Sequence, residues 1–130
     1  MVARTVVPLP NDLLSSSLAR RSVREFVAAH QIRDEATDAV VMIASELVAN
    51  AIVHGTEPVA LAVAYQEPEV TVEVSDGDPR TERIRLRAAD DPAPGGRGLR
   101  IVASLADRWG VRPSERGKTV WATKRTLARG

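Results

Sequence analysis

The sequence contains no cysteine, two histidines and only four aromatic residues in 130 positions. The missing thiols exclude disulfide bonds, thiolate zinc sites and a cysteine nucleophile. Two histidines leave little scope for a histidine-based metal site, and four aromatic side chains are too few for the base-stacking platforms of single-strand-binding proteins. These scarcities remove several classes of site before any motif is considered.

Charge and long apolar runs are also limited. The 18 basic and 17 acidic residues give a net charge of +1, which argues against a general nucleic-acid-binding protein. All basic residues except Lys118 and Lys124 are arginines, a bias that we attribute to the codon usage of a GC-rich genome. No apolar run reaches the roughly 18 residues of a membrane span, and the first residues lack the apolar segment of a signal peptide. We therefore expect a soluble, cytoplasmic protein that binds neither nucleic acid nor membranes.

The composition is that of a globular domain, with 44% hydrophobic and 27% charged residues. A chain of this length is expected to form a single domain, residues 1–130, with a core of its own. Hydrophobic periodicity and turn residues predict a strand at 3–8, helices at 14–29, 34–53 and 98–107, and strands at 58–65, 69–75, 108–112 and 118–125. This order predicts an α+β fold, a two-layer sandwich of a mainly antiparallel, mixed sheet with helices on one face.

The predicted helix at 34–53 is apolar nearly all round and should therefore be deeply packed. It nevertheless carries Glu46 and Asn50, which lie four residues apart on one face. A carboxylate in an apolar helix is costly unless it is paired or lines a polar cavity. The spacing alone favours a simple Glu–Asn hydrogen bond at the helix surface over a functional site.

Two further segments have both a structural and a functional interpretation. Asp76-Gly77-Asp78-Pro79 is typical of a turn, but Asp76 could also be a carboxylate held at a strand end, where Gly77 lets a ligand approach. The run 95–99, Gly-Gly-Arg-Gly-Leu, opens a predicted helix whose backbone N–H groups could bind phosphate. It lacks the Gly-Lys-Ser/Thr of a P-loop, and a linker or helix entry explains it equally well.

Taken in order along the chain, these motifs resemble the GHKL (Bergerat-fold) ATP-binding module. The resemblance rests on Glu46-x-x-x-Asn50, the Asp76 motif, Gly96-x-Gly98 and Gly117-Lys118-Thr119, and it extends over residues 14–125. Within that group the sequence is similar to small histidine-kinase-like regulators of actinobacteria and to anti-sigma-factor serine/threonine kinases. It departs from the family at the Asp76 motif, where a bulky residue and a proline replace glycines of Asp-x-Gly-x-Gly.

The resemblance implies ATP and Mg²⁺ as cofactors and assigns a role to each motif. Asn50 would complete the Mg²⁺ shell together with ATP phosphates, since Mg²⁺ needs few protein ligands. Glu46 would be the general base of the reaction. Asp76 would accept a hydrogen bond from the adenine amino group, and Gly77 would let the ring lie close to the backbone.

The remaining implied contacts lie in the second half of the chain. The phosphates would be met by Gly96, Arg97, Gly98 and Leu99 at the start of the third helix. Thr119 would assist at the adenine through its hydroxyl or a bound water, and residues 80–97 would form the lid over the nucleotide.

The function that follows from the resemblance is regulation of transcription by partner switching. An anti-sigma kinase phosphorylates an antagonist (anti-anti-sigma) protein and sequesters a sigma factor, and homodimers are common in such families. The alternative is a catalytically inactive module, with or without ATP, that acts by sequestration alone. A third possibility, accidental motif matches in an unrelated α+β protein, predicts no nucleotide binding.

Overall fold

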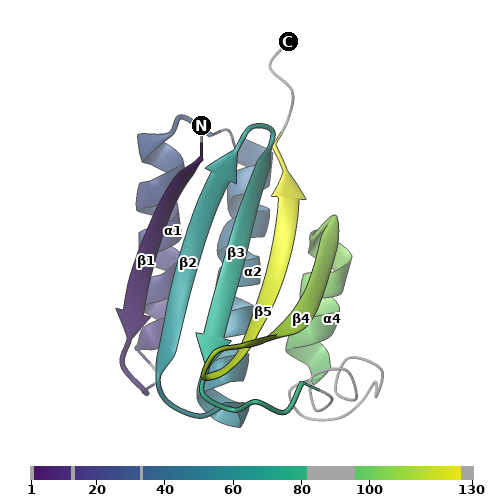
Figure 1. Cartoon of the computed structure of the whole chain (residues 1–130). Coiled ribbons are helices and arrows are strands. Elements are labelled where there is room, and N and C mark those ends of the chain that lie inside the picture. Colours follow the sequence, from purple (N-terminus) through teal and green to yellow (C-terminus); the bar gives the residue numbers. More distant parts are fainter. Residues whose placement is uncertain (1, 13, 33, 82–95, 127–130) are drawn as a thin grey trace.

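The described part of the chain forms two layers, a five-stranded sheet and three helices that cover one of its faces (Figure 1). The computed structural model describes residues 2–12, 14–32, 34–81 and 96–126. The elements in order are β1 (Ala3–Leu9), α1 (Ser15–Ala29), α2 (Asp34–His54), β2 (Val59–Gln66), β3 (Glu69–Asp76), α4 (Gly96–Leu105), β4 (Arg108–Ser114) and β5 (Gly117–Arg125). The predicted α+β sandwich is confirmed, and each predicted element lies within a few residues of its observed position.

The strands lie in the order β1-β2-β3-β5-β4, and every pairing in the described part of the sheet is antiparallel. The sheet is therefore antiparallel and not mixed. Two tight hairpins, β2–β3 and β4–β5, lie side by side, and β5 pairs with β3 so that the second hairpin extends the first (Figure 1). This arrangement brings the end of β3 next to the start of β5, with Asp76 opposite Lys118.

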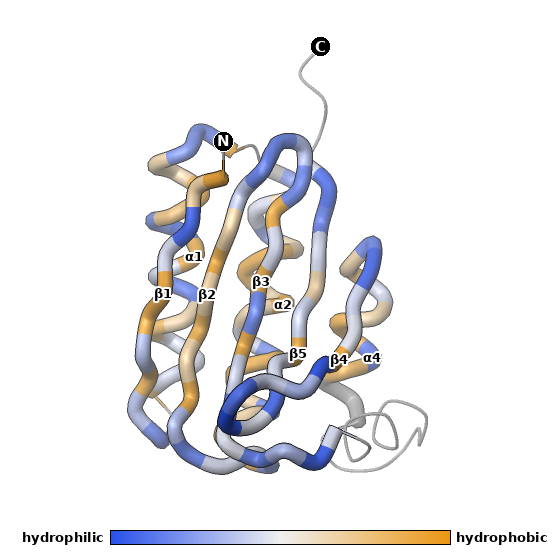
Figure 2. The backbone as a smooth tube through the Cα atoms, viewed as in Figure 1, coloured by the Kyte–Doolittle hydropathy of each residue, from blue (hydrophilic) through white to orange (hydrophobic). Residues whose placement is uncertain are grey.

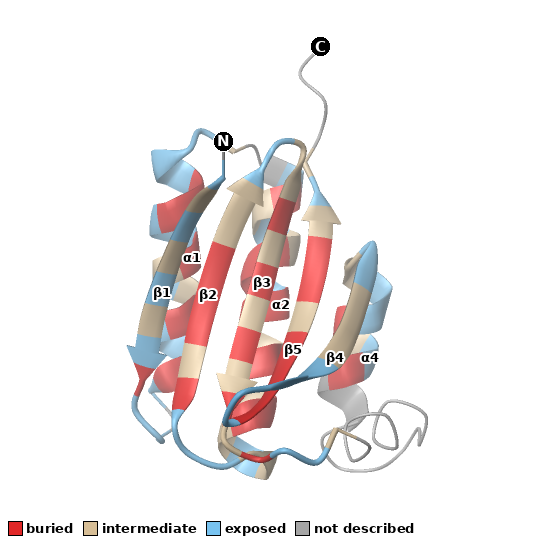
Figure 3. Cartoon of the chain, viewed as in Figure 1, coloured by how far each residue is buried: buried red, intermediate tan, exposed pale blue. Residues whose placement is uncertain are grey.

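Side chains alternate between the two faces of the sheet, as the period of an extended chain requires. Val70, Val72 and Val74 of β3 are buried toward the helices, whereas Glu69, Thr71 and Glu73 are only partly buried, and Figure 3 shows the resulting alternation. On the open face, Glu73 pairs with Arg4 and Arg112, and Glu69 pairs with Arg108. Exposed pairs of this kind stabilise a fold by only about 0–1 kcal/mol each, so the helix-covered face carries the core.

Helix α2 is the centre of that core. It contacts α1 on one side, α4 on the other and the strands β2, β3 and β5, and its Ile43 and Leu47 are almost completely buried. By length and composition, Glu35–His54 is apolar enough to cross a membrane, but half of this segment is buried inside the domain, as in a core helix. Figure 2 shows its apolar residues where it lies behind the sheet.

Leu61 provides a test of this packing, because its side chain in β2 is fully buried between the sheet and the helices. We expect Leu61→Ala to lower the free energy of unfolding by about 2–5 kcal/mol through lost contacts and a residual cavity. The control is Val6→Ala in the neighbouring β1, where the side chain is 53% exposed and the expected change is within about 0.5 kcal/mol. Urea denaturation measures both, and equal effects of the two substitutions would contradict the assignment of the core.

Candidate functional site

Four chain segments meet at one end of the sheet. These are the last turns of α2, the end of β3, the start of β5 and the start of α4, all at the lower end of the molecule in Figure 1. The chain reverses direction between α2 and β2 and again between β4 and β5, so the motif residues, far apart in the sequence, lie at this same end. The sequence motifs with functional interpretations therefore converge, apart from those in residues 82–95, which lie outside the described part of the chain.

A small cavity lies between α2 and the sheet at this end. It is too narrow to admit a water molecule. Apolar side chains form most of its wall and three polar or charged residues contribute to it; the lining consists of Leu47, Asn50, Ala51, Gly55, Val74, Asp76, Lys118 and Val120. The structure thus brings Asn50 and Asp76 together at one cavity, which the sequence interpretation of a ligand site requires.

Asn50 is buried, with 7% of its surface exposed, and its side-chain oxygen Oδ1 has no hydrogen-bond partner among the described residues. Buried polar atoms are nearly always hydrogen-bonded, so an unpartnered amide oxygen marks a place where a ligand or ion can bind. An amide oxygen is also a ligand type that Mg²⁺ accepts. In the described segments, no cluster of three or more His, Cys, Asp or Glu side chains could hold a metal alone. Any Mg²⁺ here would therefore need phosphate or water oxygens beside Asn50.

Glu46 lies one turn before Asn50 on α2 and is half-buried. Within the described residues no hydrogen bond joins the Glu46 and Asn50 side chains, so the Glu–Asn hydrogen bond that the spacing favoured is not formed, and Asn50 Oδ1 has no partner there. The preceding residue, Ser45, accepts a hydrogen bond at its Oγ from the Arg20 guanidinium of α1, at 2.9 Å. Glu46 does not line the cavity, so the two residues face different parts of the site.

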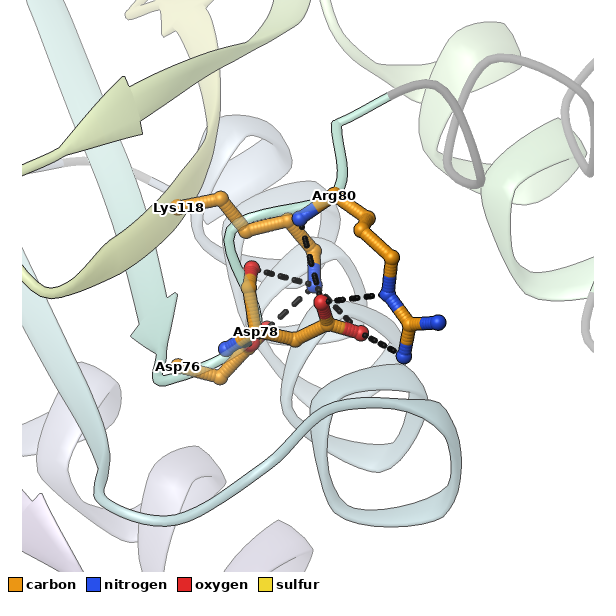
Figure 4. Close-up of polar contacts among 4 residues, drawn as sticks. All are labelled: Asp76, Asp78, Arg80 and Lys118. Carbon is orange, nitrogen blue, oxygen red and sulfur yellow. Dashed lines mark hydrogen bonds and ion pairs between the residues drawn. The ribbon is translucent and has the colours of Figure 1, made fainter.

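Asp76 is 5% exposed and lies at the end of β3. Its Oδ1 accepts hydrogen bonds from the Lys118 ammonium group at 3.0 Å and from the backbone N–H of Asp78 at 2.8 Å (Figure 4). The carboxylate also lies against Gly55, where an added Cβ would be only 2.6 Å from Asp76 Cγ. Glycine is required at position 55 because α2 ends in direct contact with this carboxylate.

Asp78 and Arg80 extend the charged group beyond β3. Both Asp78 carboxylate oxygens accept hydrogen bonds from the Arg80 guanidinium, at 2.9 and 3.1 Å, and Oδ1 also accepts one from the Arg80 backbone N–H (Figure 4). The hydrogen bonds from Arg80 and the nearby Lys118 charge hold the pKa of the Asp78 carboxyl far below its ordinary range, and they outweigh the opposing effect of burial.

Lys118 is the site residue that sequence reasoning missed. It is 2% exposed and its Nζ lies 3.0 Å from Asp76 Oδ1, 3.3 Å from the carbonyl oxygen of Asp78 and 4.0 Å from Asp78 Oδ2. The sequence did contain a signal for its burial. Lys118 lies two and four residues before Val120 and Ala122 in the same strand, so its side chain points to the same face as theirs, which is the core face. Thr119, which was expected at the adenine, pairs with Ser75 in the register and is not brought to the cavity.

Two glycines allow close packing around Asp76. A Cβ on Gly77 would overlap the carbonyl oxygen of Glu57. The backbone N–H of Gly77 donates a hydrogen bond to the carbonyl oxygen of Thr56 at 2.6 Å. A Cβ on Gly117 would overlap the carbonyl oxygen of Asp76. The protein's own backbone therefore occupies the space beside Gly77 on this side.

The expected phosphate-binding residues lie at the start of α4. Gly96, Arg97 and Gly98 form its first turn, where the backbone N–H groups have no partner within the helix and the helix dipole favours anions. The side chain of Leu99 is fully buried in the core, so only its backbone could meet a phosphate. Most of the expected lid, residues 80–97, lies outside the described residues.

The structure thus places an amide, a carboxylate and a helix N-terminus at one end of the sheet in a two-layer α+β domain. Residues 9–124 match the histidine kinase-like ATPase domain family, and the chain belongs to it. No curated protein matches the sequence, whereas 18 chains in solved structures do.

One of these structures contains the RsbU and RsbW domains of Rv1364c from Mycobacterium tuberculosis. It superposes with a TM-score of 0.72 at 19% sequence identity and covers 95% of this chain. The likeness confirms the fold. The present chain spans 32% of the length of that protein chain.

The family membership allows one correction at the Asp76 motif. Counted from Asp76, the two glycine positions of Asp-x-Gly-x-Gly fall at 78 and 80, where this chain has Asp78 and Arg80. The expectation that Pro79 replaces a glycine is wrong. The residues that do replace the glycines form an ion pair, and its acidic member, Asp78, also contacts Lys118.

The lowered pKa of Asp78 predicts a pH dependence of stability. An unfolded aspartate takes up its proton near pH 4, whereas folded Asp78 stays ionised to lower pH. Its contribution is therefore fully present above about pH 4 and is lost as the pH falls from there through the folded pKa. Melting temperatures should fall more steeply between pH 5 and pH 2 in the wild type than in Asp78→Asn. Arg80→Gln, which removes the largest cause of the shift, should flatten the curve in the same way, and three parallel curves would contradict the assignment.

Proposed function

We propose that this protein binds Mg²⁺–ATP at the end of the sheet and acts as an anti-sigma-factor kinase, which transfers the γ-phosphoryl group to a Ser or Thr of an antagonist protein. The observation that carries the proposal is the unpartnered oxygen of buried Asn50 in a cavity shared with Asp76. The family membership of residues 9–124 supports ATP as the ligand.

Each residue of the site has a defined task in this proposal. Asn50 Oδ1 would coordinate Mg²⁺, and the N–H groups at the start of α4 would bind phosphate oxygens. The bound Mg²⁺–ATP would supply the phosphoryl group and the charge neutralisation that phosphoryl transfer requires. The Asp76 carboxylate would accept a hydrogen bond from the adenine amino group and thereby select the base.

Glu46 would act on the acceptor and not on the nucleotide. Its carboxylate would take the proton from a partner Ser or Thr hydroxyl, or from water, as that oxygen attacks the γ-phosphorus. The bond from phosphorus to the β–γ bridging oxygen breaks, and ADP leaves with that electron pair. The half-buried position of Glu46 outside the cavity supports this role, because an incoming hydroxyl must reach it from solvent.

The partners in this proposal are proteins. The shared fold with the RsbW domain of Rv1364c supports the partner-switch interpretation, in which an antagonist protein and a sigma factor compete for the kinase. An ATP-dependent regulator of transcription would work in the cytoplasm. Because homodimers are common in the families that the sequence resembles, the protein would be tested as a homodimer.

Two observations favour a second candidate, an inactive module that acts by sequestration. The cavity is too narrow for water, and charged residues stand at both glycine positions of the Asp76 motif. A protein of this kind would bind its partners without phosphoryl transfer. Retention of Glu46 and of the unpartnered Asn50 oxygen supports the kinase instead.

Asn50→Ala tests the metal-dependent part of the site. Calorimetric titration of the wild type with ATP should give tighter binding with Mg²⁺ than without it, and the variant should lose this difference. We expect the Mg²⁺-dependent gain to be about tenfold or more, corresponding to about 1.4 kcal/mol. Thr37→Ala, near the start of the same helix, is the control and should bind as the wild type does. A variant that keeps the full Mg²⁺ dependence would remove Asn50 from the site.

Glu46→Gln tests catalysis separately from binding. The amide keeps the size of the side chain but cannot accept the proton, so the rate of ATP turnover or partner phosphorylation should fall by roughly 10²–10⁴-fold. ATP affinity should remain unchanged. Glu35→Gln, exposed at the start of the same helix, should keep the wild-type rate in an assay of phosphate release from labelled ATP. Undiminished turnover in Glu46→Gln would exclude it as the base, and no turnover by the wild type with any partner would favour the sequestering module.

A further inference from the structure

The cavity beside Asp76 cannot receive a purine base in its present form. It does not admit a water molecule, and a base is several times larger than water. If the protein binds ATP at this site, as proposed above, a side chain in the cavity must move first. The inference below rests on that proposed function and identifies the side chain.

Most of the lining residues are fixed by the core. Leu47, Val74 and Val120 are buried and belong to the continuous apolar cluster between α2 and the sheet. Displacing any of them would disrupt close packing on all sides. Asn50 and Asp76 are the residues that the ligand itself would contact. Lys118 is the remaining large side chain, and its flexible four-carbon stem has many rotamers.

Lys118 also occupies the position that a base would need. Its ammonium group is bonded to Asp76 Oδ1 at 3.0 Å, and both side chains are only 3% exposed. The proposed hydrogen bond from a base amino group would end on this same carboxylate. An amino group of a ligand and the Lys118 ammonium group are both donors, so they compete for one acceptor.

A buried ammonium group cannot leave its counterion unless another is within reach, because an unpaired buried charge is strongly destabilising. Asp78 meets this need. Its carbonyl oxygen already lies 3.3 Å from Lys118 Nζ and its Oδ2 lies 4.0 Å away (Figure 4). A small rotation of the stem would bring Nζ to Asp78 and release Asp76.

We infer that Lys118 is an internal plug of the base site: it closes the cavity in the ligand-free protein and must pass from Asp76 to Asp78 before a nucleotide base can bind. The ion pair therefore weakens nucleotide binding, since part of the binding free energy is used to break it. A different role, in which Lys118 donates a hydrogen bond to the bound base and holds it in place, predicts the opposite effect of removing the ammonium group.

The test is calorimetric titration of Lys118→Thr with Mg²⁺–ATP. Removal of the plug should lower the Kd for ATP by about tenfold relative to the wild type. Lys118→Met is the second variant, because it keeps the length of the stem and removes only the ammonium group; it should also bind more tightly. The matched control is Lys124→Thr, which removes the other lysine from the same strand, about 20 Å away, and should leave the Kd unchanged.

The outcomes separate this inference from the proposed function. Tighter binding by both Lys118 variants supports the plug, as does ATP binding by these variants when the wild type binds none. Equal or weaker binding by folded Lys118 variants, with binding by the wild type, overturns the plug and leaves the nucleotide site intact. The absence of ATP binding in wild type and variants alike rejects the nucleotide site itself, and the plug with it.

Discussion

The carboxylate of Asp76 is the group on which the functional end of the sheet depends. It is buried, yet it accepts the Lys118 ammonium group and the Asp78 backbone N–H and lies against the last turn of α2 at Gly55. Glycine at positions 55, 77 and 117 allows the chain segments around Asp76 to approach each other closely. A buried carboxylate is stable only with such partners, so the hairpin register, the end of α2 and the acid–base residues after β3 are all arranged around it.

Helix α2 couples this site to the core. Its apolar residues are buried against α1, α4 and the sheet, which fixes the helix in position, while Glu46 and Asn50 lie in its second half. A binding residue on a helix that is packed on three sides keeps its geometry when a ligand arrives. The position of Asn50 is therefore set by the same contacts that stabilise the fold.

The fold could be predicted almost completely from the sequence, because strand alternation and helical periodicity depend on local patterns. The sequence also singled out Asn50 and Asp76, each a polar residue in an apolar element, and the structure places both at one cavity; their roles in binding stay predictions. The Glu46–Asn50 hydrogen bond was an error of the spacing argument, which does not show where a side chain turns. Lys118 was missed because a lysine near a turn is normally exposed; its burial depends on the pairing of β5 with β3, which places it opposite Asp76. The same register directs Thr119 to the other face.

The central claim is that Asp76 is the base-binding residue of an ATP site, and the most direct measurement is a calorimetric titration of wild type and Asp76→Asn with ATP in the presence of Mg²⁺. An amide at this position presents the same shape but no negative charge to the amino group of the base. The account predicts saturable binding by the wild type and a Kd at least about tenfold higher in a folded Asp76→Asn variant. Equal affinity in the two proteins would show that ATP binds elsewhere and would contradict the account.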